Sequence, residues 1–343
     1  MVLPLDWLYG CGAAMRNWLY DRQMLRSFQF DFPVIGVGNL STGGSGKTPM
    51  VDYLVRMLGD YRVATLSRGY GRRSKGYLLA GAQPAVEDLG DEPAWLKSQH
   101  PNLEVAVCES RVHGVAALLQ DAPDLDLVIL DDVFQHRSIN PGLNLLLTTW
   151  QKPFTKDKPL PGGRLREFRS GAGRADAVIV TKCPDGLSAE KTRLAADIQR
   201  YAGAAVPVYF AGLRYAEPRL IQGDASLLRQ PYLVTGIANP QVLADYAKGQ
   251  WPEMRKHRAF RDHHKFSVGQ LKMLIEEARK LHADGILLTE KDAMRWPSQQ
   301  DFPVWTQPVE MYLADGEVEF FKMIHDYIWK AELSRPEHHL EDQ

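Results

Sequence analysis

A short glycine-rich segment carries residue types that bind phosphate groups. Gly43-Gly44-Ser45-Gly46-Lys47-Thr48 follows an apolar run at 33–37 and precedes a predicted helix at 47–58. Glycines let backbone N–H groups turn inward around phosphate oxygens, and the helix N-terminus adds partial positive charge. The lysine of such a loop contacts the β- and γ-phosphates, which makes it a catalytic candidate, and the threonine binds Mg²⁺. The predicted nucleotide-binding residues are Asn39, Ser41, Thr42, Gly43, Gly44, Ser45, Gly46, Lys47 and Thr48.

Ser41 departs from the usual form of this motif, which has a glycine at that position. The alternative interpretation is a glycine-rich turn that merely closes a strand–helix unit. Gly-Lys-Thr directly after a strand favours phosphate binding. The loop alone predicts a protein that binds and cleaves a nucleoside triphosphate.

A second acidic element follows at the end of an apolar strand, where Asp131 and Asp132 succeed residues 125–130. In P-loop enzymes an acidic residue on a neighbouring strand organises Mg²⁺. We therefore expect Asp131 or Asp132 to bind the metal together with Thr48; an ordinary turn is the alternative. His136, four residues further on, either contacts substrate or phosphate or has a structural role, and the chemistry favours neither.

The segment Thr181-Lys182-Cys183-Pro184 argues against a GTPase switch. Such proteins recognise guanine with Asn-Lys-x-Asp, and here Pro184 replaces the aspartate. No ABC-type signature is visible either. A kinase with a separate wall for its acceptor is favoured over two alternatives, a soluble P-loop kinase or ligase acting on a small molecule and an NTP-hydrolysing switch protein.

Short apolar runs alternate with helical stretches along the first 210 residues. Such runs indicate parallel strands that are covered on both faces. Strands are expected at 33–37, 62–66, 105–108, 127–130, 143–148, 177–180 and 206–210, and helices at 47–58, 92–99 and 112–120. The predicted fold class is α/β, a P-loop, doubly wound, mostly parallel sheet.

The alternation restarts after an extended connector at 213–220. Strands are expected near 232–236, 258–260, 286–288 and 308–313, and helices at 240–248, 268–282 and 317–331. These elements predict a second, smaller α/β domain. The expected organisation is an N-terminal amphipathic helix at 1–30, a P-loop domain at 31–210, a smaller domain at 211–333 that closes a cleft, and a disordered tail at 334–343.

Composition excludes several classes of protein. The chain has 343 residues, enough for two domains, and its net charge of −1 shows no basic excess for nucleic-acid binding. Cys11, Cys108 and Cys183 are few, odd in number and without metal-ligand spacing, which favours a reducing cytoplasm. No run of 18 apolar residues and no signal-peptide pattern is present, so neither a transmembrane helix nor a cleaved signal is expected.

An ordered set of motifs, covering nearly the whole chain, resembles the tetraacyldisaccharide 4′-kinases of lipid A biosynthesis. Besides the phosphate loop, the motifs are Ser67-Arg68-Gly69-Tyr70-Gly71-Arg72, Gly90-Asp91-Glu92-Pro93, Asp131-Asp132-Val133-Phe134-Gln135-His136, Pro161-Gly162-Gly163-Arg164-Leu165-Arg166-Glu167, Thr235-Gly236-Ile237-Ala238-Asn239-Pro240, Asp262-His263-His264 and Leu288-Thr289-Glu290-Lys291-Asp292-Ala293. That family's loop also lacks the first consensus glycine, which accounts for Ser41. Val133 replaces a usual glycine, and Arg164 a proline or small residue.

The resemblance implies transfer of the γ-phosphate of ATP, with Mg²⁺, to the 4′-hydroxyl of a tetraacyldisaccharide 1-phosphate, giving lipid IV-A. It implies Asp91 as general base with His263 as its partner, although His264 stays an alternative. It also implies a peripheral position on the cytoplasmic face of the bacterial inner membrane, and it implies no protein partner. Without the resemblance, the favoured interpretation of Asp91 is that it caps the N-terminus of the helix at 92–99. A phosphorylated substrate further suggests Arg166, Glu167 and Arg111 as contacts.

The N-terminal helix has an apolar arc rich in aromatic side chains. At about 100° per residue, the arc contains Trp7, Leu8, Cys11, Met15, Trp18, Leu19 and Leu25. This pattern is typical of a helix that lies in a membrane interface, or of one whose apolar face packs on its own domain. The lipid substrate favours the interface, so residues 1–27 are expected to contact the membrane.

Overall fold

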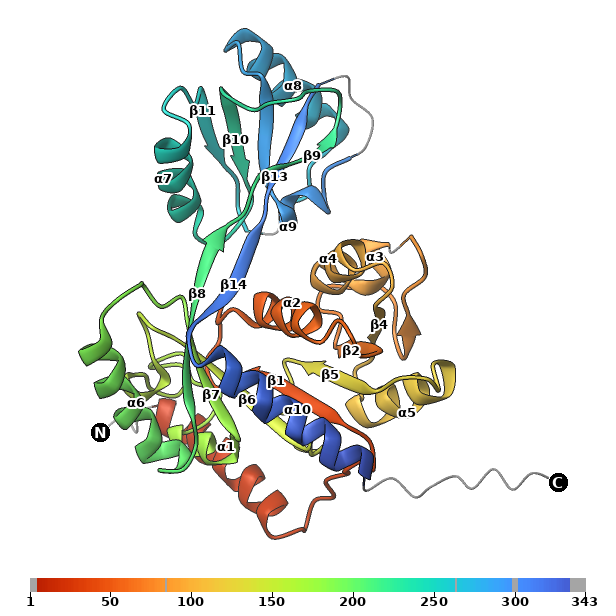
Figure 1. Ribbon diagram of the computed structural model, residues 1–343, viewed down its shortest axis with the longest axis vertical. Coiled ribbons are helices and arrows are strands. Elements are labelled where there is room, and N and C mark those ends of the chain that lie inside the picture. Colours follow the sequence, from red (N-terminus) through yellow and green to blue (C-terminus); the bar gives the residue numbers. More distant parts are fainter. Residues whose placement is uncertain (1–4, 84, 263, 298–301, 334–343) are drawn as a thin grey trace, which may run out of the picture.

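The computed structural model describes residues 5–83, 85–262, 264–297 and 302–333. Two β-sheets form a larger and a smaller lobe, joined by two long strands, β8 and β14 (Figure 1). The elements up to the junction are α1 (Leu5–Asp21), β1 (Val34–Asn39), α2 (Lys47–Met57), β2 (Val63–Ser67), β3 (Leu78–Leu79), α3 (Val86–Leu89), α4 (Asp91–Gln99), β4 (Glu104–Val107), α5 (Arg111–Asp121), β5 (Leu127–Asp131), β6 (Leu143–Thr149), η1 (Phe154–Lys156), η2 (Arg169–Arg174), β7 (Ala177–Thr181), α6 (Ser188–Ala202) and β8 (Val208–Tyr215).

The larger sheet has the strand order β14-β8-β7-β6-β1-β5-β2-β4-β3. Its inner strands are parallel, and only the edge strands β14 and β3 run antiparallel to their neighbours. β1 lies between β5 and β6, so the phosphate loop leaves the sheet beside the carboxyl end of β5. The predicted fold class, an α/β doubly wound sheet, is confirmed.

Helices cover both faces of this sheet because its strands are apolar on both sides. On one face, α2, α4 and α10 (Glu317–Leu333) pack against strand residues such as Ile35 and Ile129. On the other face, α5 packs against β2 and β5, and α6 packs against β6 and β7. The sheet therefore holds the phosphate loop on a rigid, fully buried frame.

The smaller lobe repeats this construction on a smaller scale. Its sheet has the order β11-β10-β12-β13-β9, in which only β9 is antiparallel. One face is covered by α8 and the other by α7. The elements from the junction onward are β9 (Arg219–Gln222), β10 (Pro231–Thr235), α7 (Pro240–Gln250), β11 (Lys256–Ala259), α8 (Val268–Lys280), β12 (Gly285–Thr289), α9 (Glu290–Ala293), β13 (Val304–Gln307) and β14 (Val309–Asp315).

Two sequence expectations need correction. Helix α1 ends at Asp21, and the chain from there to residue 30 is not helical. The region 211–333 divides between the two sheets: β14 pairs with β8, and α10 buries Phe320 and Ile324 in the core of the larger lobe. Periodicity identified these elements but carries no information on which sheet they join.

Candidate active site

The phosphate loop lies between β1 and α2, where the sequence places it. Gly46 precedes α2 with φ of 87°, a left-handed conformation that favours glycine. The Asn39 amide donates a hydrogen bond to the Ser45 hydroxyl at 2.8 Å, and the Lys47 ammonium lies 3.4 Å from Asn39 Oδ1. Thr48 is buried at the start of α2. These contacts hold Lys47 beside the loop, and Thr48 follows it directly.

A second segment supports the loop on the Ser41 side. Ser41 forms an antiparallel bridge with Leu165, and the Thr42 N–H donates to the Arg164 carbonyl at 2.7 Å. A serine side chain is compatible with this extended, paired backbone, whereas a turn would favour glycine. The missing consensus glycine therefore fits the local structure.

The two carboxylates at the end of β5 have different surroundings. Asp132 Oδ1 lies 3.5 Å from Lys47 Nζ and accepts from Arg166 at 3.0 Å. Burial tends to raise the pKa of Asp132, but Lys47 and Arg166 hold it below its usual value. Asp131 Oδ1 is buried without a hydrogen-bond partner among the described residues. Burial and the charge of Glu92 raise the pKa of Asp131 to about 7.

Asp91 and Glu92 begin α4 and face the smaller lobe. Gly90 has φ of 90°, and a Cβ there would lie 2.7 Å from a backbone oxygen, so the turn into α4 requires glycine. Arg295 Nε lies 3.6 Å from Asp91 Oδ2, and Lys291 Nζ lies 2.6 Å from Glu92 Oε1. Two carboxylates of one lobe thus meet two cations of the other. Gly90, rather than Asp91, is the cap residue of α4.

A cavity of about 670 Å³ adjoins Asp91 between the lobes. Its lining combines aromatic and charged side chains: Tyr70, Arg73, Glu87, Asp91, Lys265, Phe266, Arg295 and Trp296. His263, the expected partner of Asp91, lies outside the described residues. His264 is described, and its backbone carbonyl accepts a hydrogen bond from Arg295 at 3.1 Å.

Two residues that were expected to contact substrate, Arg111 and Glu167, instead form hydrogen bonds within the protein. Arg111 is 1% exposed, and its guanidinium donates to the backbone carbonyls of Cys108 and Asp131. Glu167 is 3% exposed and accepts from Asn17 at 2.6 Å and Arg174 at 2.8 Å. Both side chains satisfy internal polar groups, which corrects the expectation that they face a ligand. Arg166 does reach the site, through Asp132.

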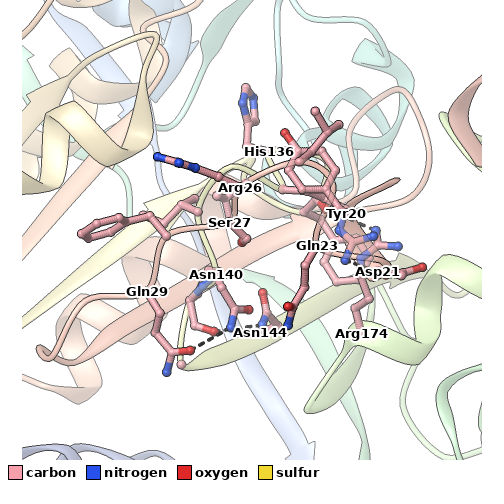
Figure 2. Close-up of a pocket in the computed structure, with 18 of the residues that line it drawn as sticks. Tyr20, Asp21, Gln23, Arg26, Ser27, Gln29, His136, Asn140, Asn144 and Arg174 are labelled. Atoms are coloured by element: carbon pink, nitrogen blue, oxygen red, sulfur yellow. Dashed lines mark hydrogen bonds and ion pairs between the residues drawn. The ribbon is translucent and has the colours of Figure 1, made fainter. Parts of the chain in front are cut away.

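His136 lines a second cavity, of about 780 Å³, between the end of α1 and residues 133–144 (Figure 2). Figure 2 shows Tyr20 and Arg174 on one side of this space and Gln29 on the other, with His136 above. Burial and the charge of Arg111 lower the pKa of His136 to about 4. The imidazole is therefore neutral at physiological pH and can accept or donate a hydrogen bond.

Helix α1 contacts the protein through polar side chains and leaves several large apolar side chains exposed. Asn17 reaches Glu167, and Arg16 donates to the Gln135 carbonyl at 3.1 Å. Met15 is 65% exposed and Trp18 50% exposed. Among the described residues, no helix is long and apolar enough to span a membrane.

Sequence reasoning missed two groups beside the loop. Lys182, at the end of β7, donates to the Gly44 carbonyl at 2.8 Å. Glu92 lies near Thr48, and Lys291 Nζ lies 2.6 Å from Glu92 Oε1. Glu92 and Lys291 both lie in motifs that resemble those of the kinase family, and this position is the sequence signal that could have identified them.

Comparison with known proteins agrees with this geometry. The model of the tetraacyldisaccharide-1-P 4′-kinase family matches residues 1–328. The tetraacyldisaccharide 4′-kinase of Cytophaga hutchinsonii is 43% identical over 298 residues, which cover 85% of this chain and 84% of that protein. The Flavobacterium johnsoniae protein of the same name is 38% identical over 335 residues and covers 96% of both chains.

The crystal structure of the "apo" form of LpxK from Aquifex aeolicus in complex with ATP matches the fold with a TM-score of 0.75 at 28% identity. The match covers 95% of this chain and 98% of that one. Family, sequence and structure therefore agree over nearly the whole length, and the chain belongs to the tetraacyldisaccharide-1-P 4′-kinase family.

Proposed function

We propose that this ATP-dependent kinase phosphorylates the 4′-hydroxyl of a tetraacyldisaccharide 1-phosphate to form lipid IV-A, with the site residues assigned as follows. The observation that carries the assignment is the meeting of three parts: the phosphate loop with Lys47, the acidic end of β5, and the Asp91–Glu92 step of α4. Positioning and charge stabilisation account for most of the catalysis of phosphoryl transfer, and this arrangement provides both.

Thr48 and Asp131 are the protein groups that would hold Mg²⁺. The described residues contain no group of three or more His, Cys, Asp or Glu residues that would bind a metal without other ligands. Mg²⁺ bound with a nucleotide takes most of its ligands from phosphates and water, so one carboxylate and one hydroxyl suffice. The buried, unpartnered Asp131 Oδ1 favours Asp131 over Asp132 as the ligand. When bound, the metal neutralises phosphate charge.

Lys47 and Arg166 are proposed to contact the transferred phosphoryl group. Asp132 holds both of their side chains, at 3.5 Å from Lys47 Nζ and 3.0 Å from Arg166 Nη1. A fixed pair of cations stabilises charge on the phosphoryl oxygens without reorganisation during the reaction. Asp132 is therefore proposed to orient these cations.

Asp91 is proposed as the general base that takes the proton of the 4′-hydroxyl. A sugar hydroxyl is a weak nucleophile at neutral pH, and a positioned carboxylate can accept its proton as the transition state forms. Asp91 lines the interlobe cavity, which offers aromatic side chains for a sugar and cations for its phosphate. His263 stays a predicted partner of this base.

The N-terminal helix is proposed to dock on the inner membrane from its cytoplasmic face, beside the cavity that contains His136. Asn17 and Arg16 contact the protein, whereas Tyr9, Met15 and Trp18 are exposed. Full burial of a large apolar side chain contributes about 1.5–3 kcal/mol, and these half-exposed side chains would contribute roughly half of that each. His136 would then meet the polar part of a lipid held along α1.

Transfer of labelled phosphate from ATP to the tetraacyl disaccharide 1-phosphate, in detergent with Mg²⁺, tests the function. The expected result is acceptor-dependent turnover. Rapid ATP hydrolysis without acceptor would instead support a switch protein, and no transfer to the lipid would refute the proposal.

Membrane docking is tested by sedimentation with vesicles of anionic phospholipid. A Met15→Glu/Trp18→Glu variant should lose vesicle binding, because charge replaces the exposed apolar side chains. The matched control is Val318→Glu/Trp329→Glu on α10, where both side chains are also exposed. Equal loss in both variants would show that binding does not depend on α1.

A further inference from the structure

The short helix α9 of the smaller lobe lies against α4 of the larger lobe, next to the proposed catalytic residues. Its residues come from the Leu288–Ala293 motif, which has no catalytic or binding role in the proposed mechanism. Among the described residues, the contacts that join α9 and the turn after it to α4 include Lys291 with Glu92 at 2.6 Å, Arg295 with Asp91 at 3.6 Å, and Ser98 with Met294 at 3.7 Å. The two ion pairs fall on consecutive residues of α4.

The base of α9 is fixed to the smaller lobe. Thr289 caps the helix, and its hydroxyl also donates to Asp292 Oδ2 at 2.7 Å. Asp292 is fully buried, and the same oxygen accepts from the Gly236 N–H at 2.9 Å. Lys291 is therefore carried by a rigid element, and its side chain reaches across to Glu92 of the other lobe.

Glu92 connects this lysine with the phosphate loop. It is a first-turn residue of α4 near Thr48, the proposed metal-binding residue. Lys291 is also near enough to Lys182 to affect that side chain, which holds the Gly44 carbonyl of the loop. The Lys291 ammonium thus contacts α4 directly and lies near a lysine that holds the loop.

We propose that Lys291 is a positioning residue through which the smaller lobe acts on the phosphate loop: its ammonium fixes Glu92, and Glu92 fixes the Thr48 hydroxyl. The pair forms only when the lobes are together, so the nucleotide site is complete only in that arrangement. The catalytic consequence rests on the proposed function, whereas the nucleotide-binding consequence does not.

The exposure of the pair makes the test practicable. The side chains of Lys291 and Glu92 are 38% and 39% exposed, so their ion pair contributes little to folding stability. Lys291→Met is expected to fold normally while lowering kcat and the affinity for Mg²⁺-ATP. Loss of a group that orients a metal ligand typically costs about 10–100-fold, and Lys291→Arg should restore most of it.

A double-mutant cycle distinguishes action through Glu92 from an independent charge effect. Lys291→Met, Glu92→Gln and the double variant are compared by kcat, by KM for ATP and by calorimetric titration with Mg²⁺-ATP. If Lys291 acts through Glu92, the double variant is no worse than Glu92→Gln alone. Lys272→Met is the matched control, since Lys272 is an exposed lysine on α8 of the same lobe.

Either of two results would overturn the inference: wild-type kcat and nucleotide affinity in Lys291→Met, or losses that multiply in the double variant. The calorimetric titration with Mg²⁺-ATP needs no acceptor. It therefore tests the effect of Lys291 on nucleotide binding even if the lipid is not phosphorylated. Absence of transfer by the wild-type chain would refute the proposed function instead.

Discussion

Replacing Glu167 by alanine tests whether this residue anchors the N-terminal helix rather than contacting substrate. Glu167 is 3% exposed, and its carboxylate accepts from Asn17 at 2.6 Å, Arg174 at 2.8 Å and Gln135 at 3.2 Å. Removing one partner of a buried ion pair costs about 3–5 kcal/mol. The Arg174 side chain is 23% exposed and can regain water, so the lower end of that range, about 3 kcal/mol, is expected.

The assay is urea unfolding followed by circular dichroism, with limited proteolysis to detect release of α1. Asn17→Ala removes one hydrogen bond to a charged acceptor and should cost about 1.5 kcal/mol. Glu276→Ala, at an exposed site on α8, is the control and should change stability by less than about 0.5 kcal/mol. If Glu167→Ala unfolded like the control but lost catalysis, the anchoring role would be wrong and substrate contact would be supported.

Three further predictions concern the site and the lobe junction. Asp91→Ala should lower kcat far more than KM, because a general base acts in the transition state; wild-type kcat would remove Asp91 from that role. Lys47→Met should lower kcat about 10³-fold in the transfer assay while circular dichroism stays unchanged, since a phosphoryl-stabilising cation is lost. Burial raises the pKa of Glu290 from 4.5 to about 7, so its contribution to stability is full below pH 4.5 and is lost as the pH rises through 7. As the pH rises from about 5 to about 8, the unfolding free energy of Glu290→Gln should therefore increase by about 2–3 kcal/mol relative to that of the wild type, as measured by urea unfolding. If the difference between the two unfolding free energies stayed constant with pH, the raised pKa would be contradicted.

Local sequence patterns predicted the parts of the structure that local physics determines. The strand–loop–helix unit around Lys47 needs only an apolar run, a glycine-rich turn and a helix start, all within about twenty residues. The strand that ends at Asp131 was equally readable, because a strand buried on both faces is apolar throughout.

Long-range partners were not readable in the same way. In sequence, Arg111 and Glu167 resemble ligand-binding residues. Only the fold shows that Arg111 donates a hydrogen bond to the Cys108 carbonyl and that Glu167 accepts one from Asn17. The pairing of Glu92 with Lys291 joins residues that are 199 positions apart. Periodicity likewise predicted a helix at 317–331, but it could not reveal that this helix, α10, packs on the first sheet.

The two strands that join the lobes have a consequence for how the chain is built. Tyr215 of β8 and Val309 of β14 are register partners, and the Ala216 N–H donates to the Pro308 carbonyl at 3.1 Å. The polypeptide thus leaves the larger sheet and re-enters it at the same residue pair of the β8–β14 strand pair. In topological terms the smaller lobe is an insertion into an edge hairpin, at a point that a two-residue turn would close. The nucleotide-binding lobe and the inserted lobe can therefore vary in length and sequence independently, except where they meet, as at Lys291, Arg295 and Arg219.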